Sequence, residues 1–355
     1  MPHTIAFFPT YARRIPGEQR WRTTVAGMVS RPLPLRSHRR TLAVGVLKRL
    51  LDLNATQIES EVFQRRAEAF LFQRVAGQRV QIALGGRLLD AGYTDRTGHF
   101  RADFDLDDGI IDSLSSATSP ECRWICYDAI PDDPDAFESQ TVDRQDTPST
   151  GGRIQIIEPL GVSVISDIDD TVKVTNVANR RELLANTLVR EFSAVPGMAE
   201  IYQRWQGRSI AFHYVSASPW QLTKCLCGFL ADSGLPAGSM HLKLFRLKDS
   251  TPLGRLASRK RSKRRAVEQI MADFPERTFL LVGDSGERDP EVYAAIARRN
   301  PAQVAGIVIR QLAAKTRPEK ILARLHRLAQ RMPEVSLRVF TTAADLEAFF
   351  PPSTS

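Results

Sequence analysis

The sequence lacks long apolar runs. No stretch reaches the roughly 18 apolar residues that a membrane-spanning helix needs. Near the N-terminus, one short apolar patch, Ile5 to Phe8, is followed by no cleavage-site pattern, so no secretory signal is predicted. We therefore expect a cytoplasmic protein that can attach to a membrane surface only peripherally.

Cysteine is also scarce. The chain has four cysteines, Cys122, Cys126, Cys225 and Cys227, whose spacing matches no common zinc framework. Buried free thiols in a reducing compartment are the better interpretation.

The charge balance is basic, with a formal net charge of +9 and a pI near 9.6. Such a balance suits an anionic partner, either nucleic acid or a lipid surface, and charge alone does not choose between them. With 355 residues, the chain is long enough for two domains. Nothing in the sequence indicates its oligomeric state.

A composition change marks a domain boundary. The run Pro-Asp-Asp-Pro-Asp at 131–135 opens a stretch that is rich in breakers and has no apolar periodicity. We predict an N-terminal domain over 1–130, a linker over 131–152, and a second domain over 153–350.

The N-terminal part indicates strands. Gln78–Leu84 and His99–Leu106 alternate apolar and polar residues, and a Gly-containing turn precedes the second run. We predict a small, mainly-β, antiparallel sandwich. Leu42–Leu53 has helical spacing and basic residues on its other face. A helix that packs on the sandwich is favoured over one that lies on a membrane surface.

The second domain has a different pattern, in which continuous apolar runs alternate with segments that have helical periodicity. This alternation predicts an α/β fold with a doubly wound parallel sheet, where ligands bind beyond the carboxyl ends of the strands. No insertion is large enough to predict a big cap domain. The predicted strands are Val162–Ile165, Ile210–Val215, Phe279–Val282, Val304–Ile309 and Leu337–Phe340.

Polar residues follow three of these runs: Asp167-Ile-Asp-Asp-Thr171 follows the first, Ser216 the second, and Gly283-Asp284 with Asp289 the third. Each piece alone could be a helix cap or a turn. Together at successive strand ends they indicate a site. Several carboxylates without clustered His or Cys favour Mg²⁺.

At this point the sequence resembles the haloacid dehalogenase superfamily, through D-x-D-x-T at 167–171 and G-D-x4-D at 283–289. It is more similar to one branch, the fungal actin-patch-associated phosphatidate phosphatases and their bacterial relatives. The phrases that carry this resemblance are Asp-Ile-Asp-Asp-Thr-Val-Lys, Tyr-Val-Ser-Ala-Ser-Pro-Trp and Gly-Asp-Ser-Gly-Glu-Arg-Asp-Pro-Glu. The likeness covers about 160–310 well and the N-terminal domain only loosely.

The resemblance implies a role for each matching residue. Asp167 would be the nucleophile that forms an aspartyl-phosphate, and Asp169 would be the acid and base. Thr171 would steady the turn that aims Asp169, while Ser216 would donate a hydrogen bond to the phosphoryl group. The Mg²⁺ ligands would be Asp167, the Asp169 backbone carbonyl, Asp284 and Asp289.

A lysine is needed to offset charge on the phosphate and the nucleophile. The basic tract over 259–265 offers two, and Lys263 has the family-like spacing before the next apolar residues, so we choose it over Lys260. The other cations of the tract could hold anionic lipid, or they could be solvated surface. These residues are Arg259, Lys260, Arg261 and Arg264.

The predicted activity is thus a Mg²⁺-dependent phosphatase, and the resemblance points to conversion of phosphatidate to diacylglycerol. Its partner would be phospholipid at a membrane surface, and no specific nucleic acid is expected. A phosphoprotein or another bulky phosphomonoester remains an alternative substrate. Two non-enzyme alternatives are a phospho-aspartyl receiver and an anionic-lipid-binding module. The role of the N-terminal domain stays open.

Overall fold

A computed structural model describes residues 3–34, 37–38, 40–41, 44–45, 55–115, 123–130, 151–176, 180–243, 252–312, 318–347 and 349. The chain forms two compact units, residues 1–158 and 159–355. Of the predicted linker over 131–152, all but the last two residues lie outside the described part. Those two begin strand β9 (Gly151–Ile157), which pairs in the sheet of the first unit. The first unit therefore extends beyond the boundary that we predicted.

The first unit is built on a nine-stranded sheet whose main path runs β1-β3-β2-β9-β8-β5-β6, with β4 and β7 paired to β3. Every strand pair is antiparallel except β2 with β9, which is parallel. The sheet is thus mostly antiparallel, as predicted, with one parallel pair. The remaining strands are β1 (Thr4–Phe7), β2 (Thr10–Arg14), β3 (Arg20–Pro32), β4 (Phe72–Arg74), β5 (Arg79–Leu84), β6 (Arg87–Tyr93), β7 (His99–Asp107) and β8 (Trp124–Ile130).

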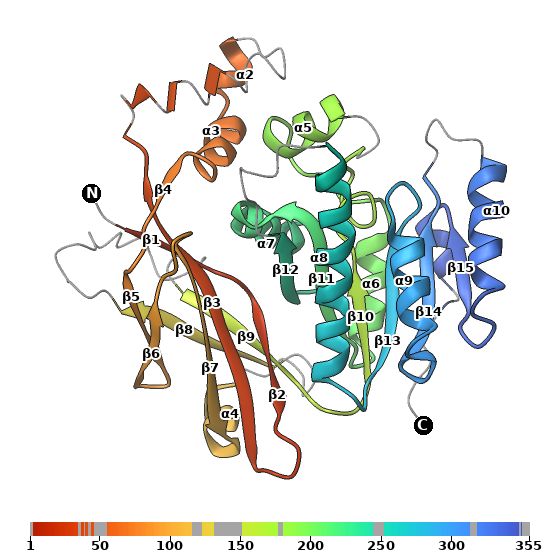
Figure 1. Ribbon diagram of the computed structural model, residues 1–355, viewed down its shortest axis with the longest axis horizontal. Coiled ribbons are helices and arrows are strands. Elements are labelled where there is room, and N and C mark those ends of the chain that lie inside the picture. Colours follow the sequence, from red (N-terminus) through yellow and green to blue (C-terminus); the bar gives the residue numbers. More distant parts are fainter. Residues whose placement is uncertain are drawn as a thin grey trace. The chain divides into compact units, whose positions relative to one another are not determined.

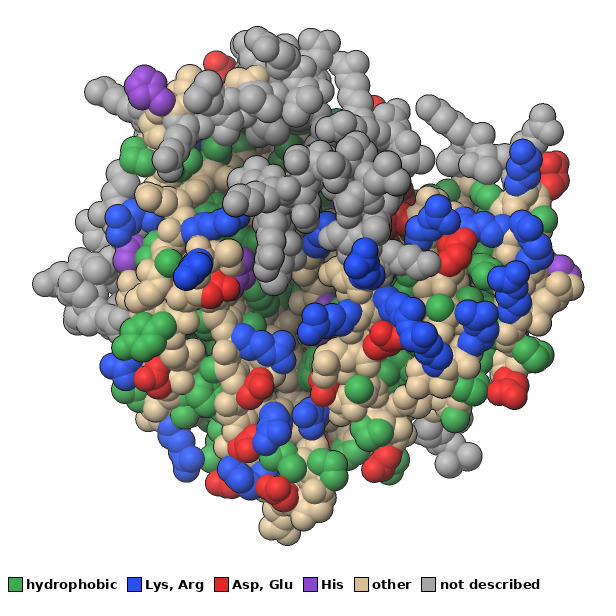
Figure 2. Space-filling view, in the orientation of Figure 1, with side chains coloured by type: hydrophobic (Ala, Val, Ile, Leu, Met, Phe, Trp, Pro, Cys, Tyr) green, Lys and Arg blue, Asp and Glu red, His purple; other side chains and the backbone are tan. Residues whose placement is uncertain are grey.

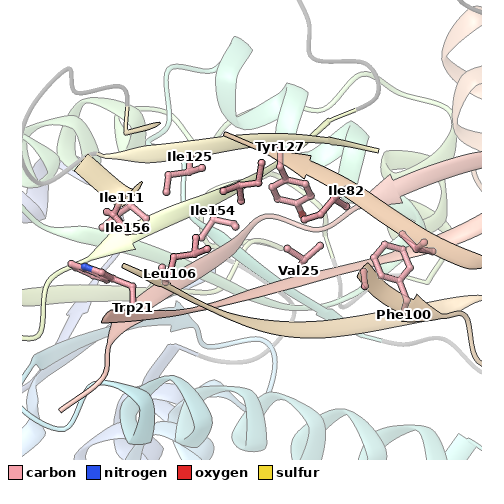
Figure 3. Close-up of a cluster of buried hydrophobic side chains, with 14 of the residues drawn as sticks. Trp21, Val25, Ile82, Phe100, Leu106, Ile111, Ile125, Tyr127, Ile154 and Ile156 are labelled. Carbon is pink, nitrogen blue, oxygen red and sulfur yellow. The ribbon is translucent and has the colours of Figure 1, made fainter. Parts of the chain in front are cut away.

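Alternation along these strands directs one set of apolar side chains inward. Figure 3 shows Trp21 and Val25 of β3 gathered with Ile82 of β5, Ile125 of β8 and Ile154 of β9 in one buried cluster. Short helices complete the unit, and most of the helix predicted over 42–53 lies outside the described residues. The helices are α2 (Ala55–Glu59), α3 (Glu61–Glu68) and α4 (Asp108–Leu114).

The second unit contains a six-stranded sheet in the order β12-β11-β10-β13-β14-β15. All its neighbouring strands pair in parallel. The predicted α/β class with a doubly wound parallel sheet is confirmed, and all five predicted strands are present. The bounds are β10 (Val162–Ser166), β11 (Ala211–Pro219), β12 (Ser239–Lys243), β13 (Thr278–Asp284), β14 (Val304–Arg310) and β15 (Leu337–Phe340).

Helices connect these strands and cover both faces of the sheet. In Figure 1, α8 and α9 lie on one face and α6 on the other. None of the described helices is long and apolar enough to cross a membrane. The helices of this unit are α5 (Arg180–Leu188), α6 (Met198–Gln206), α7 (Thr223–Asp232), α8 (Pro252–Asp273), α9 (Asp289–Ala297) and α10 (Pro318–Ala329).

Strand order places a switch point in this sheet. The chain moves outward from β10 through β11 to β12, then returns to the other side of β10 with β13 and continues to β15. The connections on the two sides of the β10/β13 pair therefore leave in opposite directions. In open α/β sheets this arrangement opens a crevice beyond the carboxyl ends of those two strands. A functional site is expected there.

Among the cysteines that the structure describes, Cys126 is a free thiol, and Cys225 and Cys227 are half-buried on α7. Cys122 lies outside the described residues. Cys126 is exposed, so the expectation that the thiols are buried was wrong for this residue.

Candidate active site

Asp167 lies at the switch point, directly after β10. Its backbone N–H donates to the carbonyl of Val282 in β13 over 2.9 Å. Its carboxylate is buried, with Oδ1 2.8 Å from Lys263 Nζ, and Oδ2 accepts a long 3.4 Å hydrogen bond from Thr171 Oγ1. Burial raises the pKa of Asp167 well above its usual value; Lys263 opposes this shift, while Asp289 and other nearby carboxylates add to it.

Lys263 reaches this carboxylate from the middle of α8 and is itself buried. Its Nζ also lies 2.5 Å from Oδ1 of Asp289. Burial alone would lower the pKa of Lys263, but the carboxylates of Asp167 and Asp289 raise it well above its usual value. The lysine that we chose from the basic tract is therefore a charged group held between two carboxylates.

The rest of the basic tract has a different environment. Arg261 is exposed, and Arg264 is half-buried and paired with Glu268 at 2.8 Å. The side chains of Arg259 and Lys260 lie outside the described part of the chain. Among the cations of this tract that the structure describes, only Lys263 reaches the carboxylate cluster.

Three buried carboxylates converge at this point. Asp167, Asp284 and Asp289 each offer an oxygen, and these oxygens lie within 4.8 Å of one another. Asp284 Oδ1 accepts the backbone N–H groups of Gly286 and Glu287 at 2.6 and 3.1 Å. Among the described residues, Oδ2 of Asp284 and Oδ2 of Asp289 are buried without a hydrogen-bond partner.

This crowding is costly without a cation. Burial raises the pKa of Asp284 well above its usual value, and the neighbouring Asp289 carboxylate raises it further. Buried carboxylate oxygens without donors are normally neutralised by protons or by metal coordination. The cluster can therefore hold a metal ion, and its all-oxygen donor set is the kind that hard cations prefer.

Asp169 occupies a separate polar pocket. Its Oδ1 lies 2.8 Å from Lys173 Nζ and accepts from Thr175 Oγ1 at 2.9 Å. Its Oδ2 accepts from Ser216 Oγ at 2.9 Å and Ser218 Oγ at 2.6 Å. Burial by itself would raise the pKa of Asp169, but Lys173 and these hydroxyl donors outweigh burial and lower it far below its usual value.

Directly after Asp169, the loop that follows β10 has a left-handed turn at Asp170, whose φ is 58°. The Asp170 carboxylate accepts the N–H groups of Thr175 and Asn176, both at 2.7 Å. Asp170 therefore caps the loop through its side chain. Its carbonyl accepts from Arg310 Nη1 at 2.8 Å, which ties the loop to the end of β14.

Four residues that contact Asp169 or Asp170 were not identified as site residues from the sequence. They come from the loop after β10 and from the ends of β11 and β14, and they are Lys173, Thr175, Ser218 and Arg310. Lys173 and Ser218 do stand in the phrases that carry the family resemblance, but a lysine or serine in a loop has no spacing signal of its own. Their proximity to Asp169 is visible only in the folded chain.

Part of the chain matches known proteins. Residues 162–311 match the family model described as "Phosphatidate phosphatase APP1, catalytic domain". The Phosphatidate phosphatase APP1 of Saccharomyces cerevisiae is 33% identical over 158 residues, 43% of this chain and 26% of that protein. An uncharacterized protein of Schizosaccharomyces pombe is 31% identical over 163 residues, 45% of this chain and 26% of that protein.

These matches are partial. The matched part of the chain spans about a quarter of the length of the curated relatives. A solved carbohydrate esterase covers 96% of this chain and 89% of its own, but at 9% identity and a TM-score of 0.20 it carries no structural argument. The matched segment begins with β10 and ends just after β14, so it holds all the carboxylates of the cluster. The resemblance predicted from the motifs is thus confirmed: residues 162–311 are similar to the catalytic domain of the phosphatidate phosphatase APP1 family.

Proposed function

We propose that the second unit is a Mg²⁺-dependent phosphatase that works through an aspartyl-phosphate and converts phosphatidate to diacylglycerol. One observation carries this proposal. Asp167 is fully buried against Lys263 and lies beside two more buried carboxylates, each with an oxygen that has no donor among the described residues. A structural ion pair needs no such surplus of negative charge, whereas phosphoryl transfer needs positioned cations.

In the first step, a carboxylate oxygen of Asp167 attacks phosphorus, and the bond from phosphorus to the leaving alcohol oxygen breaks. Asp169 gives that oxygen its proton. To act as the acid, Asp169 must carry a proton before the leaving oxygen takes it, and the phosphoryl group can bring that proton as its monoanion. In the second step, Asp169 removes a proton from the water that attacks phosphorus, and Asp167 leaves as a free carboxylate.

The carboxylate cluster fits a hard cation. Asp167, Asp284 and Asp289 would hold Mg²⁺ together with the backbone carbonyl of Asp169, as the family resemblance implies. When bound, Mg²⁺ offsets the charge of the carboxylates and of the transferring phosphoryl group. Lys263 contributes a second positive charge at the nucleophile. Ser216 donates its hydroxyl to Asp169 in this structure and would have to turn that donor to a phosphoryl oxygen when substrate binds.

The lipid substrate rests on the name of the family and on charge. Phosphatidate is anionic and lies in a bilayer, so a peripheral, basic, cytoplasmic protein would meet it at the membrane surface. Figure 2 shows Lys and Arg side chains gathered where Figure 1 places α8, α9 and α10. Exposed arginines on α8, just after α9, on α10 and just after α10 are Arg261, Arg265, Arg298, Arg327 and Arg331. A phosphoprotein or another bulky phosphomonoester would use the same chemistry.

A phosphate-release assay tests the proposal. The protein with Mg²⁺ should release phosphate from dispersed phosphatidate, and chelation of the metal should stop the release. Asp167→Asn and Asp169→Asn should each abolish turnover, because they remove the nucleophile and the proton-transfer group, while circular dichroism stays unchanged. The matched control is Asp232→Asn, an exposed aspartate on α7, which should keep full activity.

The outcomes separate mechanism from substrate. Normal activity in Asp167→Asn would refute the aspartyl-phosphate mechanism. Release from p-nitrophenyl phosphate or phosphopeptides but not from phosphatidate would remove only the lipid assignment. A long-lived phospho-Asp167 without turnover would instead favour a receiver, and vesicle binding without any phosphate release would favour a lipid-binding module.

A further inference from the structure

Lys173 is a buried cation that the proposed reaction does not use. Its side chain is 2% exposed and lies in the loop after β10. An ammonium group is expensive to bury unless acceptors surround it. Here Nζ contacts Asp169 Oδ1 at 2.8 Å and donates to Thr175 Oγ1 at 2.7 Å, and it lies 4.8 Å from the centre of the Phe192 ring.

Thr175 links the lysine to the same carboxylate a second time. Its hydroxyl accepts from Lys173 and donates to Asp169 Oδ1 at 2.9 Å, so the three side chains close a ring of short polar contacts. Ser216 and Ser218 hold the other oxygen, Oδ2. With two donors on each oxygen, the carboxylate of Asp169 has one fixed orientation.

The loop that carries this ring is anchored independently. The N–H of Thr175 donates to Asp170, and Asn186 of α5 donates to the Thr175 carbonyl at 2.9 Å. The backbone of Lys173 bridges to Asp169 on one side and to Ala194 on the other. The loop backbone that carries Lys173 is therefore held in place by these contacts, as is general for groups that support a reacting side chain.

We propose that Lys173 is a positioning residue, with Thr175 as its relay. It orients the carboxylate of Asp169 toward the leaving oxygen in the first step and toward the attacking water in the second. The inference rests on the proposed function, because it assigns a role within the same site. A lysine that served only to neutralise a buried carboxylate would affect stability and the amount of folded protein. A lysine that aims Asp169 affects each of the two proton-transfer steps separately.

The two steps can be separated by the leaving group. A nitrophenolate leaves without a proton, so the first step with an aryl phosphate does not depend on Asp169, whereas an alkyl alcohol needs the proton. In Lys173→Met, an aryl phosphate should give a burst of about one phenol per active site and then turn over about 10²-fold more slowly than wild type. An alkyl phosphate should show no burst and lose at least as much in kcat. KM should change little for both substrates.

The experiment compares rapid-quench time courses for one aryl and one alkyl phosphate that wild-type protein hydrolyses. Phosphate on Asp167 is measured by mass spectrometry after acid quench. Thr175→Val, which removes the relay hydroxyl at nearly constant shape, should give the same burst with a smaller loss, and it serves if Lys173→Met does not fold. Tyr214→Phe is the stability control, because it removes a buried hydrogen bond to the Pro236 carbonyl, away from the ring. It should show no burst and no leaving-group dependence.

Equal losses on both substrates without a burst, in folded Lys173→Met or Thr175→Val, would overturn the positioning role and leave a structural ion pair. Wild-type rates in both variants would also overturn it. Failure of the proposed function has a different signature, since wild-type protein would then release phosphate from neither substrate and would form no phospho-Asp167.

Discussion

Gly283 illustrates how one residue determines the shape of the carboxylate cluster. It precedes Asp284 at the end of β13, and a Cβ at this position would lie 2.4 Å from Asp289 Oδ2 and 2.8 Å from Asp289 Cβ. Real Cβ contacts are not that short, so Asp289 can occupy its place beside Asp284 only because residue 283 has no side chain. The glycine in the motif is a requirement of space rather than of backbone conformation.

We expect Gly283→Ala to weaken Mg²⁺ binding by about 10–100-fold, the size of effect that displaced supporting groups usually have at metal sites. The measurement is Mg²⁺ titration of phosphate release together with isothermal calorimetry. Gly306→Ala in the neighbouring strand β14 is the control, because its nearest contacts are milder, 3.2 Å to Ser336 Oγ and 3.4 Å to Leu280 Cδ1. If Gly283→Ala binds Mg²⁺ as wild type does, Mg²⁺ binding does not depend on the space that Gly283 leaves for Asp289.

At the scale of elements, α8 divides its basic residues between two tasks. Lys263 points into the cluster and is buried, whereas Arg261 and Arg265 of the same helix are exposed. Like-charged side chains in one short tract thus have opposite surroundings because helical geometry turns each residue by about 100° from the last. In the sequence the tract is a single run of basic residues. In the helix, Lys263 becomes a candidate catalytic residue, whereas Arg261 and Arg265 become part of the surface.

We predict that Arg261→Gln weakens binding to vesicles that contain anionic lipid by about fivefold at low salt, since an arginine near such a surface contributes about 1 kcal/mol. Hydrolysis of a water-soluble phosphate should not change. Co-sedimentation at two salt concentrations measures the effect, and Lys224→Gln, an exposed lysine on α7, is the charge-matched control. Equal binding by Arg261→Gln and wild type at low salt would mean that this part of α8 is solvated surface.

The position of Lys263 on helix α8 also decides that another lysine of the helix does not take its place. Its Nζ lies at 2.8 Å from one carboxylate and 2.5 Å from the other, from a backbone position fixed by the packing of Val267 and Ile270 in the core. The site therefore depends on the register of a whole helix against the sheet. A residue of the same type one turn away, such as Lys260, starts from a different position along that helix.

At the scale of the whole molecule, a buried histidine links stability to pH. His213 lies in β11, hydrogen-bonded through Nδ1 to Ser239 Oγ at 2.7 Å. Burial lowers the pKa of His213 well below its usual value, and His241 and Arg277 lower it further. The folded protein keeps this ring neutral at a pH where the unfolded chain protonates it, so the unfolded state binds one more proton below about pH 6.5.

The free energy of unfolding of the second unit should therefore fall as pH drops from about 6.5 to 5, by up to about 1.4 kcal/mol per pH unit from this residue. Above that window the contribution is constant. His213→Gln should flatten the dependence, even if its absolute stability is lower. Urea unfolding of both proteins at pH 5, 6 and 7, with Mg²⁺ present throughout, measures the difference in slope. Parallel curves would show that His213 is not responsible.

The sequence by itself determined the α/β class and the polar strand ends. A strand that is buried on both faces of a parallel sheet needs apolar residues at every position. Continuous apolar runs such as Val162–Ile165 therefore indicate this kind of sheet by their residue types alone. Asp167, Ser216 and Asp284 lie at the ends of three of these strands. Because parallel strands bring their carboxyl ends to one edge of the sheet, the sequence also indicated that these residues share that edge. The strands of the first unit were predicted less completely, since most of them are half-buried and pair with strands far away in sequence.

Tertiary structure alone decided which polar groups meet. Lys263 reaches Asp167 across almost a hundred residues of sequence, and Ser216 turned out to contact Asp169. Lys173 gave no periodic signal, because a loop residue has no face until the loop is folded. The physical reason is general: residue types fix what must be buried, whereas the surroundings of each buried charge are set by distances of 2.5–2.9 Å between groups that only the fold brings together.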